Sequence, residues 1–357
     1  MFSNNIKSFI IINLYLLIIV DIALMLSIYY QIIIDKIKNY KYEKVLIHLT
    51  PKILAYIKNE RERLQVEKLL KTDFIQNIAI DIMVDYSEKN NIDISKKFIR
   101  LKLDTILMKK IQKKSSIVYI RKLAFMRAVT AYETLLEFTE SEDLDISYIS
   151  FFGLSLIKLP MYKTKIVIKK LVISDIARDR IIEILSGYNL KFKKWLELLE
   201  KAETNQEKVI FLKNIMLKDE IKNVESSDRI QKFLNGGKEV KIATIHALSN
   251  SRNEKYIDEL IKVYENEENW EVRVAVAKGL SNFKLERVKG TLLKMTKDTE
   301  WWVRYNAIKS IVAMGDEGLF TLIDLSLDVE DKNVSDLAYY FLNSNKDVYN
   351  TVKNIEV

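Results

Sequence analysis

The sequence has no cysteine, two prolines, eight glycines and two histidines in 357 residues. Without cysteine there is no disulfide, no thiolate metal ligand and no cysteine nucleophile, and its absence fits a reducing compartment. Tight turns between strands depend on glycine and proline, so the scarcity of both disfavours a β-rich fold. We therefore predict an all-α chain in which helices are joined by short polar turns.

Motifs that carry catalysis or nucleotide binding are missing as well. The two histidines, His48 and His246, stand in unrelated contexts and form no H-E-x-x-H or comparable metal spacing. There is no G-x-x-x-x-G-K-[ST] loop, no dinucleotide glycine fingerprint and no G-x-S-x-G elbow. We predict no catalytic residue, no cofactor and no metal site, and hence a protein that is not an enzyme.

One long apolar run stands near the amino end. Residues 9–34 form a stretch of 26 residues without Lys or Arg, well beyond the roughly 10 to 14 residues of a buried core helix. Asp21 costs about 2.5 to 3.5 kcal/mol at mid-bilayer, while each Ile, Leu, Val or Phe returns about 0.3 to 0.6 kcal/mol. The run predicts one transmembrane helix behind a short tail at residues 1–8.

The charges on either side of this run predict an orientation. Lys7 stands alone before it, whereas four lysines follow it closely: Lys36, Lys38, Lys41 and Lys44. By the positive-inside rule, the carboxyl-terminal part lies in the cytoplasm. The sequence thus predicts a single-pass protein of the cell membrane with a cytoplasmic carboxyl-terminal domain, and the abundance of Lys, Ile and Asn suggests a bacterial one.

Asp21 has two interpretations inside a predicted span. An ionisable residue there is commonly functional, so Asp21 could pair with a basic or polar group of another membrane protein. It could instead be a protonated carboxyl tolerated by lipid, or a homodimer contact near Asn13 or Ser27. We name Asp21 as the candidate contact with a membrane partner.

Apolar residues repeat with a fixed period between residues 205 and 345. Five valines recur every 31 or 32 residues: Val209, Val240, Val272, Val303 and Val334. Each is followed eight positions later by an aliphatic residue, namely Leu217, Leu248, Leu280, Ile311 or Leu342. A second set has a spacing of 31, at Ile257, Val288 and Leu319. Each unit is thus predicted to be a pair of helices.

Small residues at equivalent places, Ala247, Gly279 and Ser310, indicate close packing in the segments KEVKIATIHAL, WEVRVAVAKGL and WWVRYNAIKSI. The stretch DTEWWVRYNAIKSIVAMGDEG, residues 298–318, adds a V-R pair and a glycine turn. These features resemble HEAT repeats, and the chain is similar to bacterial membrane proteins that carry an amino-terminal span and a cytoplasmic HEAT-like array. The resemblance implies a right-handed solenoid with a concave surface for partner proteins and carries over no catalytic residues.

The predicted fold is therefore an all-α solenoid of HEAT-like helical pairs at residues 171–357, with one amino-terminal transmembrane helix. Residues 35–170 form a basic, less regular helical region that could consist of degenerate repeats. From Lys96 to Arg127, eleven Lys or Arg residues stand against one acid, Asp104, which gives a net charge of +10 where the whole chain has +8.

On a continuous helix, Lys102, Lys109 and Lys113 would form a basic stripe. The stripe has three interpretations. It could be a solvated helix back, or it could contact anionic lipid headgroups or an acidic partner, at about 1 kcal/mol per basic residue near such a surface. The third interpretation is nucleic-acid binding. It is disfavoured because no recognition motif accompanies the charge and because the chain is predicted to be anchored in a membrane.

Trp270 and Trp301 occupy the same repeat position, with Trp302 beside the second and Arg273 and Arg304 three residues further on. The tryptophans could seal the seams between repeats while the arginines bond turn carboxylates, such as Glu267, Asp298 or Glu300. Alternatively, all five residues are hot spots for a partner, because Trp and Arg are enriched at such sites. These five are the candidate partner-binding residues.

The leading hypothesis is a membrane-anchored, non-catalytic scaffold with one or more protein partners, one of which could be a membrane protein. The resemblance suggests an accessory of a membrane complex such as a polysaccharide glycosyltransferase. The alternative is an enzyme or nucleic-acid-binding protein on a HEAT-like frame, of the alkylated-base DNA glycosylase type, which also uses Trp, Asp and Arg in helical repeats.

Overall fold

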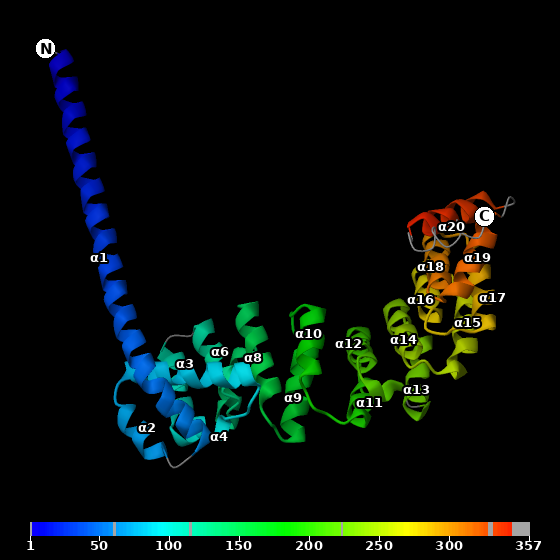
Figure 1. The fold of residues 1–357 in the computed structure, drawn as a ribbon, viewed down its shortest axis with the longest axis horizontal. Helices are drawn as coiled ribbons and strands as arrows, with labels where there is room; N and C mark the ends of the chain where they lie inside the picture. Colours follow the sequence, from blue (N-terminus) through cyan, green and yellow to red (C-terminus); the bar gives the residue numbers. More distant parts are fainter. Residues whose placement is uncertain (1, 60–61, 114–115, 223, 328–330, 345–357) are drawn as a thin grey trace, which may run out of the picture. The chain divides into compact units, whose positions relative to one another are not determined.

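The computed structural model describes residues 2–59, 62–113, 116–222, 224–327 and 331–344. Among these residues, the side chains of 2–16, of Ile18 and of 224–227 lie outside the description. Every regular element in the described ranges is helical, which confirms the all-α prediction. The chain divides into two compact units, Met1–Met161 and Tyr162–Val357 (Figure 1). The predicted domain ranges, including 35–170 and 171–357, stay predictions.

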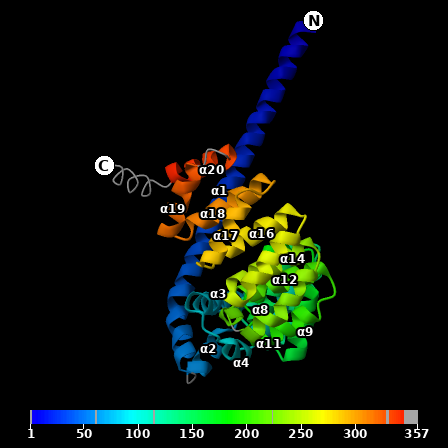
Figure 2. The same cartoon turned by 90° about the vertical axis from the view of Figure 1, so that its right-hand side faces the viewer.

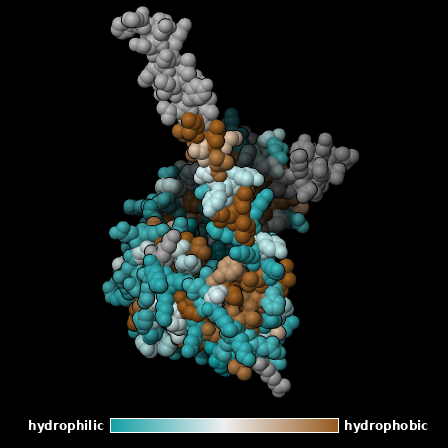
Figure 3. Space-filling view, turned by 90° about the vertical axis from the view of Figure 1, so that its left-hand side faces the viewer, coloured by the Kyte–Doolittle hydropathy of each residue, from teal (hydrophilic) through white to brown (hydrophobic). Residues whose placement is uncertain are grey.

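The first helix corrects the predicted membrane span. Helix α1 runs over Phe2–Lys58, 57 residues, and its apolar run continues without a break into a charged segment that includes Asp35 and Lys36. Exposed apolar side chains such as Met25 line it, and hydrophobic surface adjoins the part drawn in grey (Figure 3). Nevertheless, no helix among the described residues combines the length and apolarity needed to cross a bilayer.

The predicted transmembrane helix at residues 9–34 is therefore not supported, and the single-pass membrane localisation with a cytoplasmic carboxyl-terminal domain is wrong. The side chains of residues 9–16 and of Ile18 lie outside the described part. Asp21 is exposed on α1, and its predicted contact with a membrane partner loses its basis together with the span.

The rest of the first unit packs against the carboxyl-terminal part of α1. Buried side chains there, among them Leu49, Ile53 and Tyr56, mark its contact with α3. Helix α3 in turn contacts α6, and α6 contacts α8. The helices of this unit are α2 (Arg63–Leu69), α3 (Asp73–Asn90), α4 (Ser95–Arg100), α5 (Leu103–Lys113), α6 (Ile117–Phe125), α7 (Tyr132–Phe138) and α8 (Leu144–Leu156).

The second unit is built from helix pairs. Alternate helices, α10, α12, α14, α16, α18 and α20, each contact the next, and we call the last five of them the stacked row (Figure 2). The pairs are α9 (Met161–Val172) with α10 (Arg178–Ser186), α11 (Phe192–Glu200) with α12 (Asn205–Met216), α13 (Val224–Gln231) with α14 (Lys238–Asn250), α15 (Ile257–Asn266) with α16 (Trp270–Leu280), α17 (Glu286–Met295) with α18 (Trp301–Val312), and α19 (Asp316–Ser326) with α20 (Lys332–Ser344). This is the α-solenoid arrangement that the repeat period predicts.

The starts of the helices set the register of the stacked row. Helix α12 begins at a capping box, in which Thr204 Oγ1 accepts from the amide of Glu207 at 3.1 Å and Glu207 Oε2 accepts from the amide of Thr204 at 3.3 Å. Glu207 is thereby the third residue of α12, the place that buried Val240 and Val272 hold in α14 and α16.

This register corrects the first member of the predicted repeat. Val209 was aligned with Val240, but the cap places it two residues further along its helix. Leu217 consequently lies beyond the end of α12 with 60% of its surface exposed, while Ile215 is fully buried in its stead. In the next three helices, the predicted residues Leu248, Leu280 and Ile311 are fully buried.

Close helix contacts occur at the small residues. A Cβ added to Gly279 would lie 2.2 Å from Ser249 Oγ on α14, so only glycine fits there without movement of the neighbour. Ser310 Oγ donates to the carbonyl oxygen of Ala277 at 2.9 Å, and this bond joins α18 to α16 inside the protein. The small-residue pattern thus marks the contact line along the stacked row.

Candidate interaction surface

An exposed group of aromatic side chains lies at the start of α18. Trp301 and Trp302 are the first two residues of this helix and are 45% and 52% exposed. The Trp301 ring stacks on Tyr305 with centroids 5.1 Å apart and meets Trp302 edge-on at 4.7 Å. Phe341 of α20 extends the group, 5.1 Å from Tyr305 and 5.6 Å from Tyr340. We call these five residues the aromatic cluster.

Trp270 has the same place on α16 that Trp301 has on α18. It is the first residue of its helix and is 38% exposed. None of the ring–ring contacts within the described residues includes it. The structure therefore brings Trp301 and Trp302 together and leaves Trp270 as a separate exposed ring one helix away.

Arg273 joins neighbouring repeats through hydrogen bonds and an ion pair. Its guanidinium donates to both oxygens of Asp298 at 2.9 Å, and Nη1 also donates to the carbonyl oxygens of Glu267 at 3.1 Å and Glu268 at 2.8 Å. Only 12% of the Arg273 side chain and 6% of the Asp298 side chain are exposed. The guanidinium is thus used inside the solenoid.

The pKa values agree with this pairing. Burial alone would raise the pKa of Asp298, but the hydrogen bonds from Arg273 outweigh it and hold the pKa below its usual value. The same hydrogen bonds raise the pKa of Arg273. Both groups therefore stay ionised and bound to each other.

Arg304 stabilises a turn through hydrogen bonds to the backbone alone. Its Nη1 donates to the carbonyl oxygens of Asp298 at 2.7 Å and Thr299 at 2.9 Å, so it bonds the backbone where a turn carboxylate was predicted. Lys241, at the corresponding place on α14, pairs with Glu267. The basic residue that follows the repeat valine of α14, α16 and α18 thus secures a turn, and these positions differ in role from the exposed tryptophans.

A row of basic side chains lies on the same helices. Each is the ninth residue of its helix: Lys213 on α12, His246 on α14, Lys278 on α16 and Lys309 on α18. Burial lowers the pKa of His246, and the nearby charges of Lys278 and Lys213 lower it further. The two lysines therefore flank the imidazole, and we call the four residues the basic ladder.

The ladder and the aromatic cluster share one face of the helices. Residues spaced by four positions lie on the same side of a helix. Trp301, Tyr305 and Lys309 therefore lie on one side of α18, and Trp270 and Lys278 lie on one side of α16. Sequence reasoning missed the ladder because it treated His246 as an ordinary helix residue. Counting residues from the helix starts would have aligned the four.

The predicted basic stripe in the first unit is interrupted. Leu101 and Lys102 form the turn between α4 and α5, where Lys102 has a φ of 56°, so Lys102 is not on the helix of Lys109 and Lys113. All three side chains are exposed. Other basic residues of this region bond across helices: Lys97 to the carbonyl of Tyr56, Lys110 to Asn77, Arg121 to Glu88, Lys122 to Asp81 and Arg127 to Asn91. Much of the local excess of positive charge is therefore structural.

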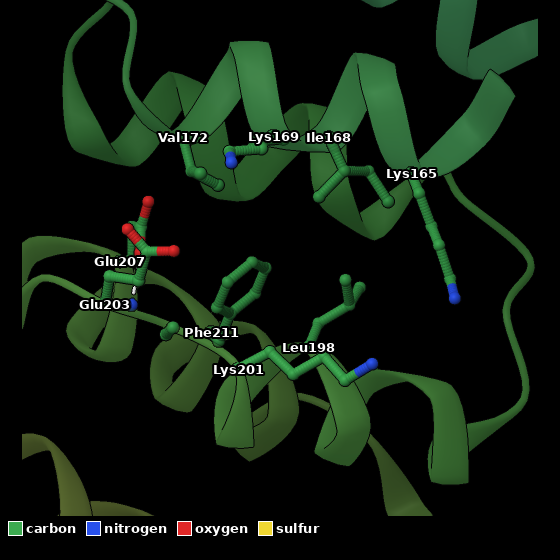
Figure 4. A pocket seen from close by; sticks show the side chains of 10 residues that line it. Lys165, Ile168, Lys169, Val172, Leu198, Lys201, Glu203, Glu207 and Phe211 are labelled. Carbon is green, nitrogen blue, oxygen red and sulfur yellow. Dashed lines mark hydrogen bonds between the residues drawn. The ribbon is translucent and has the colours of Figure 1, made fainter. Parts of the chain in front are cut away.

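A cavity of about 290 Å³ lies between α9, α11 and α12 (Figure 4). Lys165, Lys169 and Lys201 line it together with Phe211, and other apolar walls are Ile168, Val172, Leu198 and Ala202. Glu207 also faces it, but backbone amides already hold its carboxylate. Glu203 lines the cavity as well, so three cationic and two acidic side chains stand beside the apolar walls. Sequence reasoning missed it because three separate helices contribute.

Comparison with known proteins places one part of the chain. Residues 257–342, from the start of α15 into α20, match the sequence profile for HEAT repeats. No curated protein matches the chain. The matched segment contains the aromatic cluster and the Arg273–Asp298 pair.

Proposed function

We propose that this chain, an all-helical protein whose residues 257–342 are HEAT repeats, is a non-catalytic scaffold that binds a partner protein through the exposed face of the stacked row. HEAT repeats stack into elongated surfaces for protein interaction. The observation that carries the proposal is the aromatic cluster, in which Trp301 and Trp302 lie about half exposed on a rigid helix start.

The cluster has the composition of an interaction hot spot. Trp and Tyr are enriched at such sites, where large rings are buried at a low cost in side-chain entropy. Covering the exposed half of one tryptophan removes on the order of 100 Å² from water, which stabilises a complex by about 2 to 3 kcal/mol. Two adjacent tryptophans therefore supply a central contribution to affinity.

The cluster is also preorganised. Trp301 is held between Trp302 and Tyr305, and Phe341 supports Tyr305 from the next helix. Rings that are fixed before binding lose little entropy when a partner covers them. The turn bonded by Arg304 lies directly before these tryptophans, which keeps the start of α18 in place.

A recovery experiment with matched variants tests the proposal. The Trp301→Ser/Trp302→Ser double variant is compared with Phe320→Ser, because Phe320 is an aromatic residue of α19 with a similar exposure of 59%. We expect the tryptophan variant to lose a partner protein that wild type and Phe320→Ser both recover from the cells that produce the chain.

Circular dichroism and thermal unfolding establish that both variants remain folded. If the folded tryptophan variant recovers every partner at the wild-type level, the proposed role of the cluster is wrong. If Phe320→Ser loses the same partner equally, the loss is not specific to the aromatic cluster and the assigned face is wrong.

A further inference from the structure

The three lysines of the basic ladder, Lys213, Lys278 and Lys309, carry positive charge without carboxylates to neutralise it. No ion pair within the described residues involves Lys213, His246, Lys278 or Lys309, whereas most other basic residues of these repeats are paired, as Lys238 is with Glu271 and Lys241 with Glu267. The ladder differs in this respect from the structural cations around it.

The surroundings of the ladder are also free of acid. Counted from the starts of α12, α14, α16 and α18, the fifth, ninth, twelfth and thirteenth residues hold only apolar, amide, hydroxyl or basic side chains, and some of the last two follow the end of the helix. Val274 and Tyr305 hold the fifth position on α16 and α18, directly beside Lys278 and Lys309. A stripe of apolar surface therefore runs next to a stripe of unneutralised charge.

The charges of two ladder lysines act on the imidazole between them. His246 sits between two lysines, and their charges add to the effect of burial in lowering its pKa. A carboxylate bound beside these lysines would offset their mutual repulsion. The face is therefore electrostatically complementary to carboxylates.

We propose that the partner presents an acidic segment with interspersed apolar residues, which crosses α12 to α18 with its carboxylates on the basic ladder and its apolar side chains on the aromatic cluster. This inference rests on the proposed scaffold function. Neighbouring helices lie about 8 to 10 Å apart, so four helices span about 30 Å. An extended segment of about 9 residues, at roughly 3.3 Å each, covers that distance.

The geometry favours a protein over a nucleic acid. Bases bind by stacking on open aromatic faces, but Tyr305 stacks on Trp301 and Trp302 meets it edge-on.

A display selection tests the inference. Immobilised full-length chain is presented with a library of random 16-residue peptides, and each enriched peptide is measured against wild type and the Lys278→Gln/Lys309→Gln variant. The control, Lys284→Gln/Lys294→Gln, removes two exposed charges that lie outside the stacked row. The Trp301→Ser/Trp302→Ser variant is measured in parallel.

We expect the enriched peptides to be rich in Asp and Glu with aromatic or aliphatic residues between them. They should bind the ladder variant about tenfold more weakly and bind the control variant as tightly as wild type. All variants are checked by thermal unfolding, and the replaced lysines are exposed, so the fold should be unchanged.

The other outcomes overturn the inference. Peptides that lose affinity for the tryptophan variant but not for the ladder variant would agree with the scaffold function and contradict the inference that the partner is acidic. A selection without any enriched peptide would contradict both the scaffold function and the acidic partner. Tight binding of a 20-nucleotide uridine RNA that disappears in the ladder variant would replace the acidic protein with a nucleic acid.

Discussion

Replacing Arg273 by alanine removes the ion pair that joins two repeats. The substitution tests whether Arg273 stabilises the fold, in contrast to the exposed tryptophans, which are proposed to bind a partner. The side chain donates to both oxygens of Asp298 and to the carbonyls of Glu267 and Glu268. Removing one partner of a buried ion pair costs about 3 to 5 kcal/mol. We expect Arg273→Ala to lower the local stability by about 3 kcal/mol, the lower end of this range, because the amide of Glu300 still donates to Asp298.

Hydrogen exchange is the assay because repeat arrays do not always unfold as one unit. A local loss of about 3 kcal/mol corresponds to roughly 150-fold faster exchange in the amides of α16 to α18. Amides of α9 and α10 should exchange at the wild-type rate, since each repeat contacts only its neighbours.

Two further substitutions calibrate the result. Arg273→Lys keeps the charge but loses the two-pronged geometry, so it should fall between alanine and wild type. Trp302→Ala removes a ring that is 52% exposed and should change exchange in α16 to α18 by less than a factor of about ten. Wild-type exchange in Arg273→Ala, or a larger effect of Trp302→Ala, would refute the division into structural arginines and exposed rings.

Three other outcomes are expected. Nuclear magnetic resonance should find the pKa of His246 below 6.5 because of burial and neighbouring charge, and Lys278→Gln should raise it; an unchanged pKa would contradict the ladder. The hydrogen bond from Arg229 is the largest cause that lowers the pKa of Glu200 to about 2, so Glu200→Gln should cost roughly 1 kcal/mol at pH 7 after solvent screening, in urea titrations. That difference should shrink as the pH falls from about 4.5 towards 2, because the folded-state pKa is the lower one. Gly279→Ala should cost about 1 to 3 kcal/mol in thermal unfolding, since its Cβ would meet a serine of α14.

The repeat period was enough to predict the stacked row. Helices whose third residue is a buried valine, such as α14, α16 and α18, follow from a spacing of 31 or 32 residues because packing repeats with the chain. The period failed at α12, where the capping box begins the helix and replaces the valine by Glu207. The capping box set the start of α12, and a fixed repeat spacing carries no information about where a helix is capped.

The candidate site was only partly predictable. The exposed tryptophans were visible as a repeated position, but Phe341 joins them through a contact between two helices that no local pattern contains. The stripe with Lys102 failed because that residue has a positive φ, which breaks the expected helix. The predicted span at residues 9–34 is not supported, because no helix among the described residues is long and apolar enough to cross a membrane.

Photo-crosslinking from the interaction face tests the central claim most directly. Benzoylphenylalanine is placed at Trp302 in one variant and at Phe320 in another, since both side chains are aromatic and similarly exposed. The scaffold account predicts that irradiation of cells joins position 302, and not position 320, to one reproducible protein with an acidic segment at the crosslink. No adduct at position 302, or the same adduct from both positions, would contradict it.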